Sequence, residues 1–520
     1  MIAPIVLLLL VAVRMFVTQR REGSLGASSQ SSLGDRGEPV PLAGEAQGPG
    51  GEALRGGAPL PGSAGAAGGG AAPARWDLPR VLLLVLLCVL PLMVFFTLSA
   101  LGVAISPIFF WVFLVVSFLA LLRLRAAAPA RRRRTAGAGA AAAVPAETAM
   151  ALARRAEGVF APRSVAAAGG AVVVEGTLLG NPQAAFRELE SRFAGTGYLP
   201  MLQEDGEGRP VLLAIPDPSA GRKRGRAAFP WLNVVLLLLT VLTTTAAGAA
   251  HQGFNIWREP GRMATGLPYA LGIMAILGVH ELGHYFTGRW HRIEVTLPYF
   301  IPVPFGLGTF GAFISMRSPA PNRRALFDVA VAGPLAGLAI AIPALLYGLR
   351  QSVVVSGPAE SGDMLHGGVE VGSSMLFALL AKISLGSQIA AGHQLRLHPL
   401  AFAGWLGLLV TALNLLPIGQ LDGGHIAHAL FGRTRAHAIG TAALFGLLLL
   451  GVFVWSGFLT WAFIVFFVAG TRDAPPLEDI TPVDRGRAAL GAFSFALLLL
   501  ILAPVPRAFF AALGIQCPYL

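Results

Sequence analysis

Cysteine and charged residues are both scarce in this 520-residue chain. It has two cysteines, Cys88 in an apolar run and Cys517 near the end, which excludes a disulfide scaffold and a thiolate metal site. Only 13% of residues are charged, 55% are hydrophobic and the mean hydropathy is +0.67. Because a soluble domain carries about 25% charged residues, these values exclude a soluble globular protein. The chain is predicted to be a polytopic membrane protein.

Acidic residues are fewer than basic ones, and the formal net charge is +12. The Lys and Arg residues gather beside apolar runs, as the positive-inside rule requires of a membrane protein. This placement favours the lipid bilayer as the partner and argues against nucleic acid. No internal repeat of the kind found in transporters is visible.

Apolar runs near the roughly 20 residues that a spanning helix needs predict about ten membrane crossings. An uncleaved N-terminal anchor is expected because the first run lacks a basic leader and a small-residue cleavage site. The predicted spans are 2–18, 81–102, 106–122, 229–250, 267–288, 326–348, 399–418, 438–454, 457–470 and 488–506.

The segments between these runs predict the domain organisation. A strand, an amphipathic helix and a second strand are expected within 146–217, which predicts a small cytosolic α+β module. The segment 351–398 is expected to be an outer loop with one amphipathic surface helix. In chain order we expect a membrane anchor at 1–21, a disordered Gly/Ala/Pro-rich linker at 22–79, a transmembrane hairpin at 80–125, a basic linker at 126–145, the module at 146–217, a membrane core at 229–472 and a linker with a last spanning helix at 473–520.

The sequence HELGH lies inside one apolar run, at residues 280–284. On a helix, His280 and His284 share one face one turn apart, which suits two imidazole ligands on one zinc ion. Glu281 can reach a water on the metal without ligating the metal, which is the general-base role. Ionisable residues in a spanning helix are costly unless they are paired or bound to metal. The motif therefore predicts a catalytic zinc site.

A catalytic zinc usually has three protein ligands, so a third is expected elsewhere. Asp422 follows a run that ends at the same predicted membrane depth, and Pro417 and Gly419 interrupt the helix before it. A helix-capping or turn role is the alternative for Asp422. His425 and His428 are rival ligands at helical spacing.

Together, HELGH and the later sequence NLLPIGQLDG resemble the site-2 protease family of intramembrane zinc metalloproteases. The stretch 398–432 and the segment PPLEDITPVDRGR are similar to the plant chloroplast members and their bacterial relatives. The resemblance implies a helical core with a re-entrant β element, zinc bound by His280, His284 and Asp422, and Glu281 as base and later proton donor. It also implies that Asn414 holds the scissile carbonyl, although an Asn in a span can equally join two helices.

Two other features qualify the resemblance. Gly337 stands where many members of the family carry Asn. The segment 294–317 is rich in β-formers, Pro and Gly and is too broken for a spanning helix. In line with the family, it is expected to form a re-entrant hairpin whose free edge pairs with an unwound substrate; a plain surface loop is the alternative.

The predicted function is hydrolysis of peptide bonds within or near transmembrane segments of other membrane proteins. A proteolytically inactive zinc-binding scaffold or chaperone of the same fold is the alternative, and the intact Glu281 argues against it. A transporter is a third hypothesis, disfavoured by the missing repeat. The Ala-, Arg- and Gly-rich composition favours a bacterial inner membrane with the active site toward the cytosol, with a chloroplast as the other location. The substrate, the trigger and the oligomeric state are not predicted.

Overall fold

The computed structural model describes residues 144–168, 170–217, 231–256, 258–304, 306–356, 374–386, 393–453, 458, 461–462, 465, 475–503 and 505–506. The predicted anchor, linkers and hairpin before residue 144, and most of the predicted span 457–470, lie outside these residues. The chain divides into two units. One comprises Met1–Pro200 and Glu207–Arg222, and the other comprises Met201–Gly206 and Lys223–Leu520.

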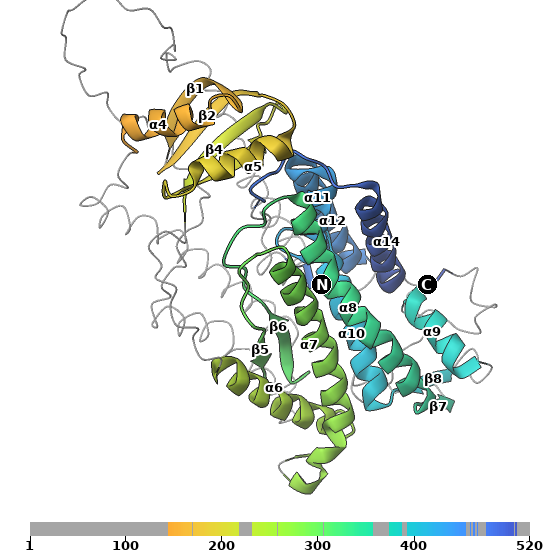
Figure 1. Ribbon diagram of the computed structural model, residues 1–520. Helices are drawn as coiled ribbons and strands as arrows, with labels where there is room; N and C mark the ends of the chain where they lie inside the picture. Colours follow the sequence, from red (N-terminus) through yellow and green to blue (C-terminus); the bar gives the residue numbers. More distant parts are fainter. Residues whose placement is uncertain are drawn as a thin grey trace, which may run out of the picture. The chain divides into compact units, whose positions relative to one another are not determined.

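The first unit is an α+β fold built on an antiparallel sheet. Its elements are α4 (Ala146–Ala156), β1 (Phe160–Ala168), β2 (Ala171–Leu178), α5 (Pro182–Phe193) and β4 (Pro210–Pro216) (Figure 1). The sheet also contains β3 (Tyr198–Glu204), whose residues from Met201 onward are grouped with the second unit, and its strand order is β1-β2-β4-β3. The side chain of Asn181 accepts hydrogen bonds from the first turn of α5, and Pro182 begins that helix. The expected strand, helix and strand are β2, α5 and β4; α4, β1 and β3 are additional.

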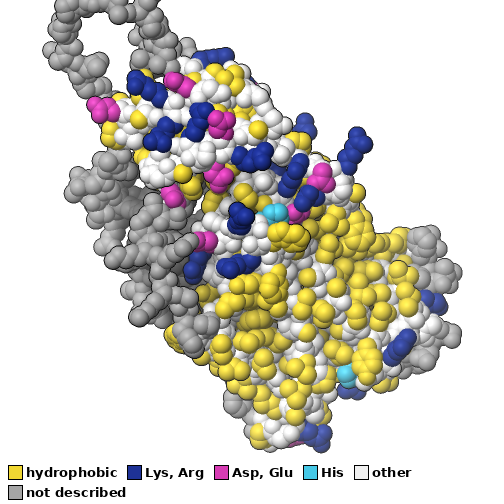
Figure 2. Space-filling model, in the orientation of Figure 1, with side chains coloured by type: hydrophobic (Ala, Val, Ile, Leu, Met, Phe, Trp, Pro, Cys, Tyr) yellow, Lys and Arg dark blue, Asp and Glu magenta, His cyan; other side chains and the backbone are white. Residues whose placement is uncertain are grey.

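The second unit contains five described helices that are long and apolar enough to cross a membrane. Hydrophobic side chains cover most of the face of this unit drawn in Figure 2. The five are Trp231–Ala250 (α6), Pro260–Trp290 (a 3-10 turn, Pro260–Gly266, followed by α7, Leu267–Trp290), Arg323–Arg350 (α8), Arg433–Gly451 (within α12, Arg433–Phe453) and Arg485–Leu502 (α14). The predicted span at 399–418 is a shorter helix, α10 (Pro399–Leu415).

Helices α7, α8 and α10 pack against one another and form the centre of this unit (Figure 1). Glycines allow close approach of their backbones. A Cβ atom at Gly348 would lie 2.3 Å from the Ala401 nitrogen, and one at Gly283 would lie 2.7 Å from the Ala332 carbonyl oxygen. Small residues at such contacts are typical of helices that pack within a membrane.

A two-stranded hairpin occupies part of the segment 294–317. Strands β5 (Tyr299–Pro302) and β6 (Thr309–Phe313) are antiparallel, with Phe300 opposite Ala312. Side chains of α6 and α7 hold its backbone: the Thr243 hydroxyl donates to the Gly308 carbonyl at 2.7 Å, and the Tyr269 hydroxyl donates to the Leu307 carbonyl at 2.8 Å. The hairpin is therefore tied to two helices of the core.

The segment 351–398 differs from its prediction. It contains the expected helix, α9 (Met375–Leu385), and a small antiparallel pair, β7 (Val353–Ser356) with β8 (His393–Arg396). Yet α9 packs against α8 and α14 and joins the main hydrophobic core, with Phe377 fully buried. The prediction of an amphipathic surface helix is wrong because the sequence of α9 is apolar on nearly all sides, and its Leu376, Phe377 and Leu380 are buried in the core.

Candidate metal centre

The motif 280–284 lies in the second half of α7, where the helix is enclosed by α8, α10 and the chain before α11 (Asp422–Phe431). His280, Glu281 and His284 are 3%, 6% and 7% exposed. Their helical spacing directs the two imidazoles to one side, with ring centroids 4.9 Å apart. Three polar side chains of the otherwise apolar helix α7 are therefore buried between α7 and its neighbouring helices.

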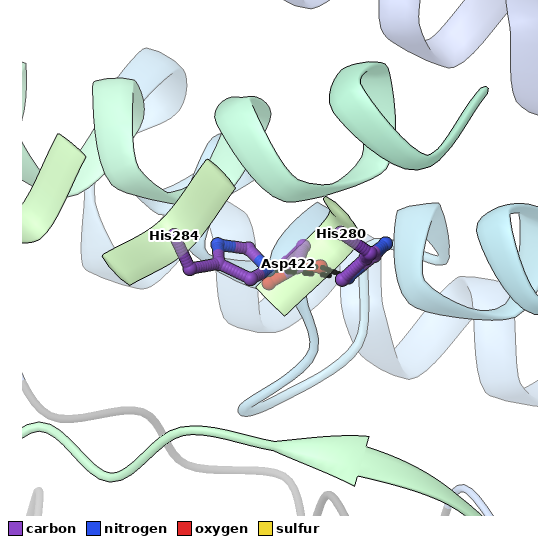
Figure 3. Close-up of side chains that lie close together, drawn as sticks. All are labelled: His280, His284 and Asp422. Atoms are coloured by element: carbon purple, nitrogen blue, oxygen red, sulfur yellow. Dashed lines mark hydrogen bonds and ion pairs between the residues drawn. The ribbon is translucent and has the colours of Figure 1, made fainter. Parts of the chain in front are cut away.

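Asp422 reaches the same place from a different part of the chain. Helix α10 ends at Leu415, the chain turns through Gly419 at φ 50°, and Asp422 begins α11. Its Oδ2 lies 3.5 Å from His280 Nε2 and 3.3 Å from His284 Nε2, and the two Nε2 atoms are 3.2 Å apart (Figure 3). Among the described residues, these three form the one group of His, Cys, Asp or Glu side chains compact enough to hold a metal ion.

The three ligand atoms fit a tetrahedral zinc ion. With zinc-to-ligand distances of about 2.0–2.2 Å, two ligand atoms of a tetrahedron are separated by about 3.3–3.6 Å. The observed separations of 3.2, 3.3 and 3.5 Å lie close to this range. Two imidazole nitrogens and one carboxylate oxygen are a ligand set that zinc prefers, and three protein ligands leave a fourth position for water or substrate.

Backbone and glycine positions in α8 set the orientation of the imidazoles. His284 Nδ1 lies 2.7 Å from the Val329 carbonyl oxygen, so that nitrogen carries the proton and donates, and Nε2 keeps its lone pair for a metal. A Cβ atom at Gly333 would lie 2.1 Å from His284 Nε2, and one at Gly337 would lie 3.2 Å from His280 Nδ1. Gly333 therefore makes room for the His284 ring.

Glu281 faces the β5–β6 hairpin. Its carboxylate accepts a hydrogen bond from the backbone N–H of Ile314, the residue after β6. Glu281 contributes no atom to the compact ligand group. The carboxylate thus lies next to the ligands, against the hairpin, and outside the ligand group.

Asn414 is the second-to-last residue of α10 and points to the same centre. Its Nδ2 is 3.2 Å from His280 Nε2. The amide therefore joins α10 to the ligand group, and the structure brings all five predicted site residues together. Their roles remain predictions.

The two rival histidines lie elsewhere. His428 Nε2 is 3.0 Å from both carboxylate oxygens of Asp479, and neither His425 nor His428 contributes to the compact ligand group. Sequence reasoning missed the Val329 carbonyl and the Ile314 N–H, since every residue carries such groups and nothing in the sequence distinguishes these two. Gly333 is the exception, because it lies in the run of small residues AGPLAG, a sequence feature that indicates close packing of α8 against a neighbouring helix.

Comparison with known proteins agrees with this geometry. The profile of peptidase family M50 matches residues 268–455, which contain all five site residues. The chain is 33% identical over 301 residues to "Probable zinc metalloprotease EGY1, chloroplastic" of Oryza sativa subsp. japonica, covering 53% of this chain and 50% of that protein. It is 36% identical over 246 residues to the Arabidopsis thaliana protein of the same name, covering 46% and 43%. With "Probable zinc metalloprotease EGY2, chloroplastic" of Arabidopsis thaliana the identity is 30% over 354 residues, covering 65% and 61%.

The chain therefore spans about half the length of the curated relatives it matches. Their names describe those proteins. The profile match at 268–455 contains the ligand set His280, His284 and Asp422. The profile match and the three curated relatives confirm the family resemblance that HELGH and NLLPIGQLDG predict. Residues 268–455 of this chain match the profile of peptidase family M50.

Proposed function

We propose that this chain is an intramembrane zinc metalloprotease that hydrolyses peptide bonds within or near transmembrane segments of other proteins. One observation carries the proposal: two histidines and an aspartate present three ligand atoms at tetrahedral spacing, and a buried glutamate that does not ligate lies beside them. The names of the relatives support the activity, and the apolar helices around the site support a membrane substrate.

His280, His284 and Asp422 would hold the zinc. When bound, zinc acts as a Lewis acid and brings the pKa of a coordinated water to about 7. Glu281 accepts the proton of the attacking water and passes it to the leaving amine. The Ile314 N–H holds the Glu281 carboxylate in place for both transfers. The Asn414 amide donates a hydrogen bond to the scissile carbonyl oxygen and stabilises the charge that develops there.

The β5–β6 hairpin provides a binding surface for the substrate. A peptide bond inside a helix is shielded by the helix's own hydrogen bonds, so the substrate must be extended before it can be cut. Each strand of the two-stranded sheet keeps one edge outside the pair, to which an extended segment can add as a further strand. Because β6 ends at the residue before Ile314, such a segment would run past Glu281.

In this proposal the site lies at the side of the membrane that carries the excess of Lys and Arg, which is the cytosolic side of a bacterial inner membrane and the stromal side in a chloroplast. Arg289 near the end of α7 and Arg323 at the start of α8 belong to the membrane ends nearest the ligands, and the positive-inside rule places such ends on that side. The basic residues within 222–226, before α6, would keep the 146–217 module on the positively charged side of the membrane as well. The relatives are chloroplast proteins by name, and they support a chloroplast location for this multi-pass protein in place of the bacterial inner membrane that composition favours.

The test is cleavage of a helix-destabilised transmembrane substrate by the purified full chain, with zinc content measured on each sample. Glu281→Gln should retain stoichiometric zinc and lose about 10²–10⁴-fold in cleavage rate, the usual contribution of a general base. Glu259→Gln is the matched control, because Glu259 lies just before the Pro260–Gly266 turn at the far end of the same spanning segment, and it should cut like wild type. Stoichiometric zinc without cleavage of two such substrates by wild type would support the scaffold and contradict the protease.

A further inference from the structure

Arg323, His428 and Asp479 form a second buried polar cluster, here called the Asp479 cluster. The three residues are 8%, 0% and 4% exposed. Arg323 Nε donates to Asp479 Oδ1 at 2.7 Å, and His428 Nε2 lies 3.0 Å from each carboxylate oxygen. None of these side chains belongs to the compact metal-ligand group.

The backbone around Asp479 is held by hydrogen bonds to the chain before α8 as well as by Arg323 of the cluster. The Leu477 N–H donates to the Ala320 carbonyl at 2.9 Å, and the Glu478 N–H donates to the Pro321 carbonyl at 3.0 Å. The Arg323 guanidinium also donates to the Asp479 backbone carbonyl at 2.5 Å. The Asp479 carboxylate is therefore presented to His428 from a fixed position beside the start of α8.

The cluster joins the two helices on which the metal ligands depend. Arg323 is the first residue of α8, the helix whose Val329 carbonyl and Gly333 position the His284 ring. His428 belongs to α11, the helix that begins with Asp422. Asp479 accepts hydrogen bonds from both, so one carboxylate sets the spacing between them.

The connection to Asp422 follows from helix geometry. His428 comes six residues after Asp422, which is about 9 Å along the axis and about 240° around it. Fixing His428 therefore fixes the rotation and the axial position of α11, and with them the Asp422 carboxylate. Helix α11 has only 10 residues and no side-chain cap at Leu421, so tertiary contacts must determine its placement.

The energetics favour a single arrangement. A carboxylate buried between a guanidinium and an imidazole is tolerated only while every partner stays in place, since an unpaired buried charge is strongly destabilising. A shift of α11 by a fraction of its diameter would break the contact with His428.

We propose that Asp479 is a positioning residue for the metal ligand Asp422, acting through His428 on α11 and through Arg323 on α8. The proposal rests on the proposed zinc site and adds to it a residue that lies 57 positions after Asp422. It explains why the segment PPLEDITPVDRGR accompanies the ligand motifs in this chain.

The experiment measures zinc affinity of the purified full chain by competition with a chromophoric chelator, and the visible spectrum of the cobalt-substituted chain. Asp479→Asn should weaken zinc binding about 10–100-fold, as loss of a supporting contact does in other metal sites, and should alter the cobalt spectrum. Glu478→Gln is the matched control. Glu478 is also buried, and its Oε1 accepts from the Ile480 and Thr481 N–H groups of its own segment, so affinity and spectrum should stay those of wild type.

His428→Leu provides the second variant, because it breaks the link to α11 and leaves the pair Arg323–Asp479 intact. It should weaken zinc binding as much as Asp479→Asn. The zinc affinity of the double variant should not fall below that of the single variant with the lower affinity, because both changes break the same link. Wild-type affinity in either folded variant would overturn the positioning role alone. Failure of both variants to fold would also overturn it, since the cluster would then hold the whole core. A wild type that binds zinc no better than Asp422→Asn would overturn the zinc site itself.

Discussion

Replacing Gly333 by Ala should abolish tight zinc binding without touching a ligand. The new Cβ would lie 2.1 Å from His284 Nε2 and 2.5 Å from two ring carbons. Since contacts below 3.0 Å are essentially never seen, the ring and α8 must separate by at least about 0.9 Å. Zinc-to-ligand distances vary by only about 0.2 Å. His284 can therefore no longer ligate in its present geometry.

The helices offer little room to absorb this change. A Cβ at Gly283, on the same side of α7, would already lie 2.7 Å from the Ala332 carbonyl, so α7 and α8 are in close contact here. Loss of one of three ligands should weaken zinc binding more than about 100-fold, which corresponds to at least about 2.7 kcal/mol.

The matched control is Gly337→Ala, one turn further along α8. Its Cβ would lie 3.2 Å from His280 Cβ and Nδ1, so a shift of a few tenths of an ångström suffices and binding should change less than about 10-fold. The assay is chelator competition on the purified full chain, with monodispersity and helicity checked for each variant. The reasoning is refuted if Gly333→Ala binds zinc like wild type, or if Gly337→Ala loses as much.

Three further predictions test individual contacts of the second unit. Asn414→Ala should keep stoichiometric zinc and lose about 10²–10³-fold in cleavage rate, as when a carbonyl-stabilising donor is removed; equal loss of zinc would instead make the residue structural. Thr243→Val removes the hydroxyl that donates to the Gly308 carbonyl. Loss of this hydrogen bond should cost about 1 kcal/mol of local stability, so amide hydrogen exchange in the turn 306–308 should become about fivefold faster. Unchanged exchange would contradict the contact. Hydrogen bonds from Arg487 lower the pKa of Asp484 from 3.8 to about 2. The Asp484–Arg487 pair therefore contributes its full stabilisation at pH values above 3.8, and this stabilisation is lost as the pH falls toward 2. The difference in unfolding midpoint between wild type and Asp484→Asn should therefore narrow between pH 5 and pH 2, and a constant difference would show that ionisation of Asp484 is irrelevant.

Local spacing was enough to predict the first half of the candidate site. HELGH in an apolar run places His280, Glu281 and His284 on adjacent positions of one helix, because helix geometry depends on nearest neighbours along the chain. The same holds for the spanning helices, whose length and hydropathy are local properties. The break between α10 and α11 was also visible, in Pro417 and Gly419.

Tertiary structure decided which distant groups meet these residues. In the sequence, Asp422 and His428 are both plausible ligands on one short helix; the rotation of α11 places Asp422 against the imidazoles and His428 against Asp479. The Val329 carbonyl and the Ile314 N–H are backbone groups that carry no sequence signal. The prediction that α9 lies on the surface was wrong for a similar reason, since its contacts with α8 and α14 cannot be read from its own sequence. Such contacts depend on how whole helices pack in three dimensions, and packing minimises the energy of the entire core, which no single segment of the chain encodes.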